Sequence, residues 1–334
     1  MTFPLPLPLA DPELAAALSA RLDLVEERLR DAVTHADLLA DSASRHLVNA
    51  GGKRLRSLLT LLTAQLGEGQ RPEVIDAAVV VELTHLATLY HDDVMDSAPM
   101  RRGAPTAHEV WGNSVAILIG DLLFARASRV VAGLGPEAVR IQAETFERVC
   151  LGQLHETVGP GAGDNAIEHY LQVLADKTGS LIATAARFGA MFAGCEPTVV
   201  EQVTTYGELA GVAFQLADDV IDVRSAAEVT GKTPGTDLRE RVATMPVLLL
   251  RERVASGAGA EDGALLAAID GDLTSDARLA EVVAALGRHS VVDETSEKAR
   301  SWGDEAIAAI AGLPAGEVKD ALVAFADALV SRAG

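Results

Sequence analysis

Hydrophobic residues recur every three or four positions along nearly the whole chain, which is the spacing of helices that bury one face. Residues 11–33 show this clearly, because an Asp-Pro start is followed by Leu14, Leu18, Leu22, Val25 and Leu29. The same spacing predicts further helices over residues 55–66, 72–91, 115–131, 137–157, 166–193, 199–223, 264–286, 294–310 and 315–332. No segment alternates apolar and polar residues as a half-buried strand does. The sequence therefore predicts an all-α fold.

The connections between these helices are short and rich in glycine, proline and polar residues, as turns are. They lie at residues 67–72, 133–136, 159–165, 231–237 and 256–263. None has the length or the repetitive composition of a flexible linker. We therefore expect residues 11–334 to form one large helical domain. Residues 1–10, in which leucine and proline alternate, are expected to form an extended lead-in.

Composition and charge disfavour several classes of function. The chain of 334 residues is 49% hydrophobic but only 4% aromatic, and a core rich in alanine, leucine and valine favours helix packed on helix. The net charge of −20 disfavours binding to nucleic acid or to an anionic membrane. Cys150 and Cys195 are too few for a disulfide framework or a zinc knuckle. We find neither a signal peptide nor a membrane-spanning apolar stretch, and we expect a cytoplasmic protein.

Two copies of the pattern Asp-Asp-x-x-Asp each end an apolar helix. The first copy consists of Asp92, Asp93 and Asp96, and the second of Asp218, Asp219 and Asp222. Residues four apart lie on one helix face, so each copy places carboxylates close together. The C-terminal end of a helix disfavours this negative charge, and a bound cation would offset the cost. Because a few carboxylates combined with substrate phosphates are typical of Mg²⁺ sites, the two copies predict metal binding.

Basic residues cluster in turns near these acidic motifs. A glycine turn leads into three cations at residues 51–56, and Arg101 and Arg102 follow the first motif. The dipeptides Lys177-Thr178 and Lys232-Thr233 each adjoin or follow a turn. Single lysines and arginines usually lie on the solvated surface. Their clustering in an acidic chain instead favours the binding of a ligand that carries phosphates.

With these motifs, the chain resembles the trans-prenyltransferases, the head-to-tail isoprenyl diphosphate synthases. The similarity spans residues 47–332 and is carried by G-G-K-R-L-R, E-L-T-H, H-D-D-V-M-D, R-R-G-A-P-T, K-T, F-Q-L-A-D-D-V-I-D and G-K-T-P-G-T-D-L. The resemblance implies a single helical bundle around a deep apolar cavity, Mg²⁺ dependence and a homodimer. It also implies that isopentenyl diphosphate is condensed onto an allylic diphosphate, with transient membrane contact during release of the lipid product.

The resemblance implies roles for individual residues. Three Mg²⁺ ions would bind the allylic diphosphate. Their main ligands would be Asp92, Asp96 and Asp218, and the supporting carboxylates would be Asp93, Asp219 and Asp222. The same diphosphate would contact Arg101, Lys177, Thr178, Gln215 and Lys232. Isopentenyl diphosphate would contact Lys53, Arg56, His85 and Arg102, with Gly52 allowing close approach of the backbone. No general base is implied, because the released diphosphate can take the proton.

At two places the sequence departs from the family pattern. Ser57 stands where the family usually has a proline, and we expect little effect. Val242 stands where the family has a lysine that binds phosphate. Arg241, at the adjacent position, is a candidate substitute for that lysine.

Four other interpretations are weighed against this one. A class I terpene cyclase uses the same metal chemistry but generally lacks a separate isopentenyl diphosphate site. A partner subunit of a heterodimeric synthase tends to lose aspartates, whereas both motifs are intact here. A metallohydrolase built on His91 and Asp92 needs further histidine ligands, and His85 and His108 form no recognisable set. An acidic helical bundle that carries lipids is the remaining alternative.

Product length is expected to depend on the helix that precedes the first motif. Ala87 lies five positions before Asp92, and in the family a small residue near this position permits long products. Leu83 and Thr84 lie about 6 Å further back along the helix, and Val80 lies another turn away. Since an isoprene unit spans roughly one turn, we predict a product of about C30 to C50, with geranylgeranyl diphosphate as the alternative. Quinone side chains and carotenoid precursors are both possible fates of the product.

Overall fold

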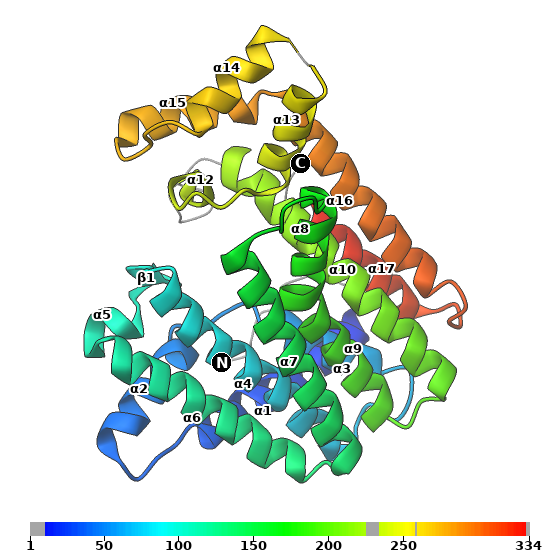
Figure 1. Cartoon of the computed structure of the whole chain (residues 1–334). Helices are drawn as coiled ribbons and strands as arrows, with labels where there is room; N and C mark the ends of the chain where they lie inside the picture. Colours follow the sequence, from blue (N-terminus) through cyan, green and yellow to red (C-terminus); the bar gives the residue numbers. More distant parts are fainter. Residues whose placement is uncertain (1–10, 225–233, 258, 332–334) are drawn as a thin grey trace. The chain divides into compact units, whose positions relative to one another are not determined.

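The computed structural model describes residues 11–224, 234–257 and 259–331 (Figure 1), and most of them lie in helices. The strands among these residues are β1 (Met100–Arg101) and β2 (Ala104–Pro105), which pair antiparallel as a short hairpin. The predicted all-α class is confirmed. The chain divides into two compact units, the first made of Met1–Val149, Ser180–Glu208 and Ala309–Phe325, and the second of Cys150–Gly179, Leu209–Ala308 and Ala326–Gly334.

The first unit is organised around one buried helix, α4 (Pro72–Met95). The other helices that lie wholly in this unit are α1 (Pro12–Ala32), α2 (Leu38–Asn49), α3 (Leu55–Ala64), α5 (Ala107–Trp111), α6 (Asn113–Ala132) and α9 (Ser180–Phe192). Helix α4 packs against α1, α3, α6 and α9. It is the one helix among the described residues that is long and apolar enough to cross a membrane, but 67% of its apolar window is buried inside the protein. A helix that is apolar on all sides is typical of a protein core.

A glycine allows α3 and α9 to approach each other closely. A Cβ atom at Gly189 of α9 would overlap the carbonyl oxygen of Thr60 and the hydroxyl of Thr63 on α3. The Thr63 hydroxyl donates a hydrogen bond to the carbonyl of Ala186, at 3.0 Å. The close helix contact therefore depends on the missing side chain at position 189.

We expect Gly189→Ala to lower the free energy of unfolding by about 1–3 kcal/mol, because overpacking forces the two helices apart. Gly263 of α14 (Ala260–Ile269) is a matched control, since a Cβ there would meet nothing within 4 Å. Gly263→Ala should be neutral or stabilise the protein by up to about 1 kcal/mol, because alanine favours helix. Urea denaturation followed by circular dichroism measures both changes. Equal effects of the two substitutions would contradict the packing argument.

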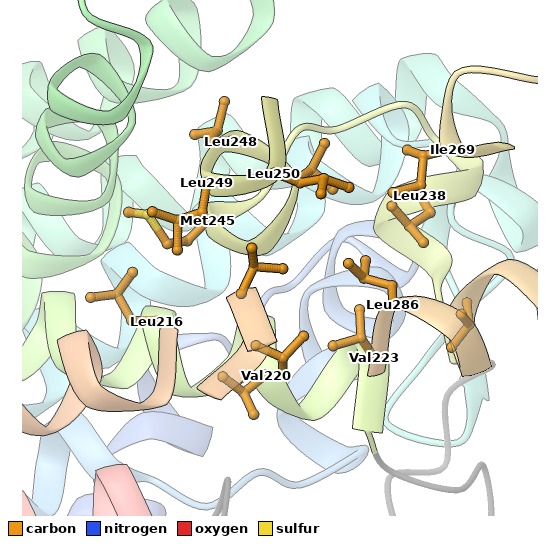
Figure 2. Packing of buried hydrophobic residues seen from close by; sticks show 14 of the residues in the cluster. Leu216, Val220, Val223, Leu238, Met245, Leu248, Leu249, Leu250, Ile269 and Leu286 are labelled. Atoms are coloured by element: carbon orange, nitrogen blue, oxygen red, sulfur yellow. The ribbon is translucent and has the colours of Figure 1, made fainter. Parts of the chain in front are cut away.

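The second unit contains its own apolar core. Its helices, wholly or in part, are α7 (Pro136–Val158), α8 (Ala166–Leu174), α10 (Pro197–Arg224), α12 (Thr236–Arg239), α13 (Met245–Ala255), α14, α15 (Asp276–Gly287), α16 (Ser290–Ala309) and α17 (Glu317–Ser331). Figure 2 shows side chains of this core, among them Leu216 and Val220 of α10, Leu249 of α13 and Leu286 of α15. The core thus packs α13 and α15 against the half of α10 that carries the second aspartate motif.

Several helix boundaries differ from the prediction. The segment predicted as one helix over residues 166–193 is α8, a π-helical turn at Ala175–Gly179 and α9. The segment at residues 264–286 falls within two helices, α14 and α15. Helices α2, α5, α12 and α13 were not predicted, because they are short or lack a regular apolar spacing. Both cysteines are free thiols, but they are not buried as expected, because Cys150 is exposed and Cys195 is half-buried.

Candidate active site

The first aspartate motif occupies the last turn of α4, as the sequence predicts. The helix ends at Met95 with Asp96 as its C-cap, and Ser97 after it has a left-handed backbone with φ of 50°. Asp92 is half-buried and Asp96 is exposed, and their spacing of four residues puts them on one face. These two carboxylates are therefore the accessible ones of the motif.

Asp93, between them, points into the first unit and is only 1% exposed. One of its oxygens accepts a hydrogen bond from Nε of Arg101, at 2.6 Å, and its other oxygen has no hydrogen-bond partner. Burial raises the pKa of Asp93, and the charge of Arg101 opposes this shift. The pair joins α4 to the hairpin of β1 and β2, so both side chains contribute to the local structure.

The hairpin places Arg102 over the glycine turn at residues 51–52. Arg102 and Gly103 form its two-residue turn, with φ of 55° and 77°, the backbone of a type I′ turn. The Arg102 guanidinium donates to the carbonyls of Leu47, at 3.3 Å, and of Gly51. A Cβ at Gly52 would lie 2.7 Å from the guanidinium carbon. Glycine at position 52 therefore leaves room for Arg102.

Arg56 and Arg102 carry the charge of a cluster in the first unit that also includes His85, and we call it the cationic cluster. Burial lowers the pKa of Arg56 to about 10, and the nearby charge of Arg102 acts in the same direction. Burial, followed by the charges of Arg56 and Arg102, lowers the pKa of His85 well below its ordinary value, so the imidazole is neutral at pH 7. Within the described part of the chain, the Nε atom of Arg56 is buried without a hydrogen-bond partner. Such a cluster is suited to an anion. Lys53, at the edge of the same turn, is exposed.

Arg54 differs from the other cations of the segment at residues 51–56. It is 3% exposed and forms ion pairs with Glu26 of α1 and Glu82 of α4. Because its guanidinium is buried and paired with two carboxylates, Arg54 is a structural residue. The sequence pattern alone groups it with Lys53 and Arg56.

The second motif lies near the C-terminal end of α10 and repeats the division seen in the first. Asp218 and Asp222 are half-buried and lie on one face, which Gln215 shares. Asp219 is 4% exposed, and both of its oxygens accept hydrogen bonds from the hydroxyl of Tyr170, at 2.8 and 3.0 Å. The backbone N–H of Met245 also donates to Asp219, at 3.1 Å.

The hydrogen bonds of Asp219 tie α10 to α8 and to the first turn of α13. Burial raises the pKa of Asp219 well above its ordinary value, whereas the hydrogen bonds from Met245 and Tyr170 oppose this shift. In both motifs the middle aspartate is thus buried and paired. Sequence spacing does not reveal this difference, because it places neighbouring aspartates on a helix without showing which helix packs against them.

Lys177 and Thr178 lie in the π-helical turn Ala175–Gly179 of the second unit. Turns of this kind inside helices occur frequently at functional sites. Lys177 forms an ion pair with Glu156 of α7, a residue that the sequence did not single out. A Cβ at Gly152 of α7 would lie 2.6 Å from the backbone nitrogen of Lys177, so this glycine allows α7 to contact the turn. Thr178 is buried.

Two other predicted phosphate contacts have different outcomes. Lys232 lies outside the described residues. Arg241 is exposed and has φ of 61°, and its guanidinium donates to the carbonyls of Asp270, at 3.3 Å, and Gly271, at 3.0 Å. Its side chain is therefore already bonded to the segment between α14 and α15. The suggestion that Arg241 replaces the lysine absent at Val242 gains no support from this geometry.

The residues predicted to set product length are all buried in α4, namely Val80, Leu83, Thr84 and Ala87. The Thr84 hydroxyl donates to the Val80 carbonyl at 2.8 Å, within the helix. Ala87 lies one turn before His91, on the same face. A Cβ at Gly120 of α6 would overlap the His91 ring. Helix α6 is therefore the helix that covers this face of α4.

Each motif supplies two accessible carboxylates, fewer than the ligands that a divalent cation requires. Within the described ranges, no group of three or more histidine, cysteine, aspartate or glutamate side chains is placed to hold a metal ion by itself. This donor set fits Mg²⁺, which keeps several waters and is usually bound by one or two carboxylates together with substrate phosphates.

Comparison with known proteins identifies the family. The profile of the polyprenyl synthetase family matches residues 38–286. The chain belongs to this family. Nonaprenyl diphosphate synthase of Mycobacterium tuberculosis is 44% identical, over 98% of this chain and 96% of that one. Heptaprenyl diphosphate synthase component 2 of Geobacillus stearothermophilus is 36% identical, over 91% of this chain and 93% of that one.

A solved structure of a geranylgeranyl pyrophosphate synthase has the same fold. The crystal structure of geranylgeranyl pyrophosphate synthase from Corynebacterium glutamicum, complexed with calcium and isoprenyl diphosphate, matches with a TM-score of 0.85 and 41% identity. The match covers 98% of this chain and 99% of that one. The family and the fold class predicted from the sequence motifs are thus confirmed.

Proposed function

We propose that this polyprenyl synthetase condenses isopentenyl diphosphate onto an allylic diphosphate in an Mg²⁺-dependent reaction. The observation that carries the proposal lies within the first unit. There, the cationic cluster of Arg56, His85 and Arg102 and the accessible carboxylates Asp92 and Asp96 belong to the same compact body. The buried Nε of Arg56 has no hydrogen-bond partner among the residues that the structure describes, and a phosphate oxygen would satisfy it.

The proposed roles follow the accessibility of the side chains. Asp92, Asp96, Asp218 and Asp222 would hold Mg²⁺, which when bound neutralises charge on the diphosphate. The allylic diphosphate would contact Lys177, Thr178, Gln215 and Lys232. Arg101, which is held by its hydrogen bond to Asp93, would be placed nearby. Asp93 and Asp219 would act by positioning, because both are buried and each accepts a hydrogen bond from a side chain, Asp93 from Arg101 and Asp219 from Tyr170.

The proposed reaction needs no basic side chain to accept a proton. The C–O bond of the allylic diphosphate breaks, and its carbon forms a C–C bond with the terminal double-bond carbon of isopentenyl diphosphate. A proton then leaves the new chain and is taken up by the released diphosphate. The lysine and arginine side chains hold the two diphosphates and stabilise the charge that develops on the leaving group.

We expect Lys53→Ala and Arg102→Ala to raise the KM for isopentenyl diphosphate more than the KM for the allylic substrate. Each removes a charge-assisted contact worth roughly 1.5–3 kcal/mol, which corresponds to about 10- to 150-fold in binding. Steady-state kinetics with each substrate varied in turn measures the two constants. Arg28→Ala, which removes a surface ion pair with Asp76, should change neither. A larger effect on the allylic substrate would reverse the assignment of the two sites.

We also propose a long product, of about C30 to C50, because Ala87 places a small side chain one turn and a half before the first motif. The nonaprenyl synthase that is 44% identical to the chain supports this proposal. Geranylgeranyl diphosphate is the second candidate, favoured by the 41% identity to the Corynebacterium glutamicum enzyme.

We propose that the protein acts as a homodimer in the cytoplasm, with no nucleic-acid partner. In the first unit, Ile117 and Leu118 of α6 are 43% and 64% exposed, and an apolar helix face of this kind is typical of an interface. The relative from Geobacillus stearothermophilus is named as one component of a synthase, so a second kind of subunit is the alternative. The single-domain organisation predicted from the sequence stays a prediction.

The experiment that tests the proposal uses the purified protein alone. It is incubated with farnesyl diphosphate, labelled isopentenyl diphosphate and Mg²⁺, and the lipid products are extracted. Label in a linear prenyl chain, lost when EDTA removes the metal, is the expected result. Conversion of the primer to a hydrocarbon without incorporation of label would instead indicate a terpene cyclase. Absence of turnover until a second protein is added would indicate a partner subunit.

A further inference from the structure

Glu26 lies on α1, outside every motif of the sequence, yet its carboxylate is buried. The residue is 5% exposed. One oxygen accepts a hydrogen bond from Nε of Arg54, and the other lies 3.4 Å from a terminal nitrogen of Arg30, whose side chain is 57% exposed. A buried carboxylate is costly without a partner. The partner that is itself buried is Arg54.

Arg54 is held by groups from three helices. Besides the bond to Glu26 on α1, its guanidinium donates to Glu82 on α4, at 2.7 Å, and to the carbonyl of Val48 on α2, at 3.3 Å. Burial lowers the pKa of Arg54, but the interactions with Glu82 and Glu26 have the larger effect, so the pKa is raised. The three partners therefore fix both the position and the charge of this side chain.

The backbone of Arg54 has a conformation that the side-chain contacts must maintain. Its φ is 50°, in the left-handed region, at the N-cap residue that directly precedes α3. This region is unfavourable for residues other than glycine, and such strain persists only where the surrounding structure imposes it. Lys53 directly precedes this residue and Arg56 follows in the first turn of α3. The backbone conformation at Arg54 therefore fixes the positions of the Cα atoms of Lys53 and Arg56, from which their side chains extend.

The same carboxylates act on the cationic cluster. Glu82 lies three residues before His85 on α4, and its charge raises the pKa values of Arg56 and Arg102 against the lowering effect of burial. Glu26 acts on Arg102 in the same direction. Because Arg54 is bonded to both carboxylates, they do not compete as direct partners for the cations of the cluster.

We propose that Glu26 and Arg54 are positioning residues for the isopentenyl diphosphate site. Their buried ion pair holds the left-handed turn that aims Lys53 and Arg56, and neither residue contacts the substrate. This inference rests on the proposed function, because that function supplies the substrate for the two cations.

The test is Glu26→Gln in the full-length protein, with both substrates varied. Glutamine keeps the size of the side chain but removes the charge that holds Arg54. We expect the KM for isopentenyl diphosphate to rise about 10-fold, as for the loss of one buried charged contact. The KM for the allylic substrate and kcat at saturation should stay within about twofold of wild type. Arg30→Ala, which removes only the exposed partner of Glu26, is the matched control and should leave all three constants unchanged.

A purely structural role predicts a different result. Glu26→Gln would then lower the midpoint of urea denaturation while the ratio of the two KM values stayed at its wild-type value, and this outcome would overturn the inference. If the single variant is too unstable to assay, Arg54→Lys is compared instead, because it keeps a cation beside the buried Glu26 and Glu82 but lacks the guanidinium that bonds both carboxylates and the Val48 carbonyl.

In the folded Arg54→Lys variant, the KM for isopentenyl diphosphate should be raised about 10-fold. A wild-type KM in that variant would also overturn the inference. A wild-type enzyme that does not elongate the primer would refute the proposed function instead, and this is seen before any variant is compared.

Discussion

Asp92→Ala and Asp218→Ala are each expected to lower kcat by about 10³-fold or more while the protein remains folded. The substituted side chains are accessible carboxylates near the ends of α4 and α10. In the proposed reaction they hold the metal that stabilises the leaving diphosphate, and groups that stabilise developing charge carry a large part of catalysis. Turnover of labelled isopentenyl diphosphate into prenyl product, at saturating substrates and Mg²⁺, measures the effect.

The melting temperature without Mg²⁺ should stay the same or rise in both variants, because each loses repulsion between neighbouring carboxylates. Asp31→Ala, at an exposed position of α1, is the control and should retain full activity. Wild-type turnover in either motif variant would refute the assignment of the two motifs as metal-binding faces.

Ala87→Phe is expected to shorten the product from a long chain to about C15–C20, with consumption of the primer largely retained. Ala87 has no exposed surface and lies on the face of α4 that is covered by α6. A phenyl ring there would occupy the path that we propose for the growing chain, whose length increases by roughly one helix turn per isoprene unit. Chromatography of the dephosphorylated products measures the shift.

Ala87→Leu provides a graded comparison and should give products of intermediate length. Equal urea midpoints for wild type and the leucine variant would show that packing against α6 is kept. A long product that is unchanged in the phenylalanine variant would mean that another helix sets the length. A wild-type product that already ends at C20 would favour the geranylgeranyl alternative.

The sequence predicted the helices that carry the two motifs closely. The pattern at residues 72–91 and 199–223 reproduces α4 and α10, because long helices that are apolar over many turns leave a strong periodic signal. It also placed each motif at a helix end. The short helix α2 was missed, although Leu39, Ala43 and Leu47 have helical spacing and its end supplies carbonyls to Arg54 and Arg102.

The sequence could not distinguish the middle aspartate of each motif from its neighbours. Asp93 and Asp219 are adjacent to accessible ligands, but Asp219 pairs with Tyr170, 49 positions earlier, and Asp93 pairs with Arg101 only because the short hairpin folds back toward α4. For the same reason the motif G-G-K-R-L-R did not reveal that Arg54 is buried, because its partner Glu26 lies 28 positions earlier. Tertiary partners of this kind are fixed by packing and leave no local pattern.

The most direct test of the central claim is the mass spectrum of the prenyl alcohols formed when the purified protein acts on farnesyl diphosphate and isopentenyl diphosphate with Mg²⁺. Phosphatase treatment releases the alcohols from their diphosphates before the measurement. Our account predicts a ladder of linear products that differ by one isoprene unit and reach about C30 to C50, absent in EDTA. A spectrum with unextended primer alone, or with cyclic hydrocarbons, would contradict it.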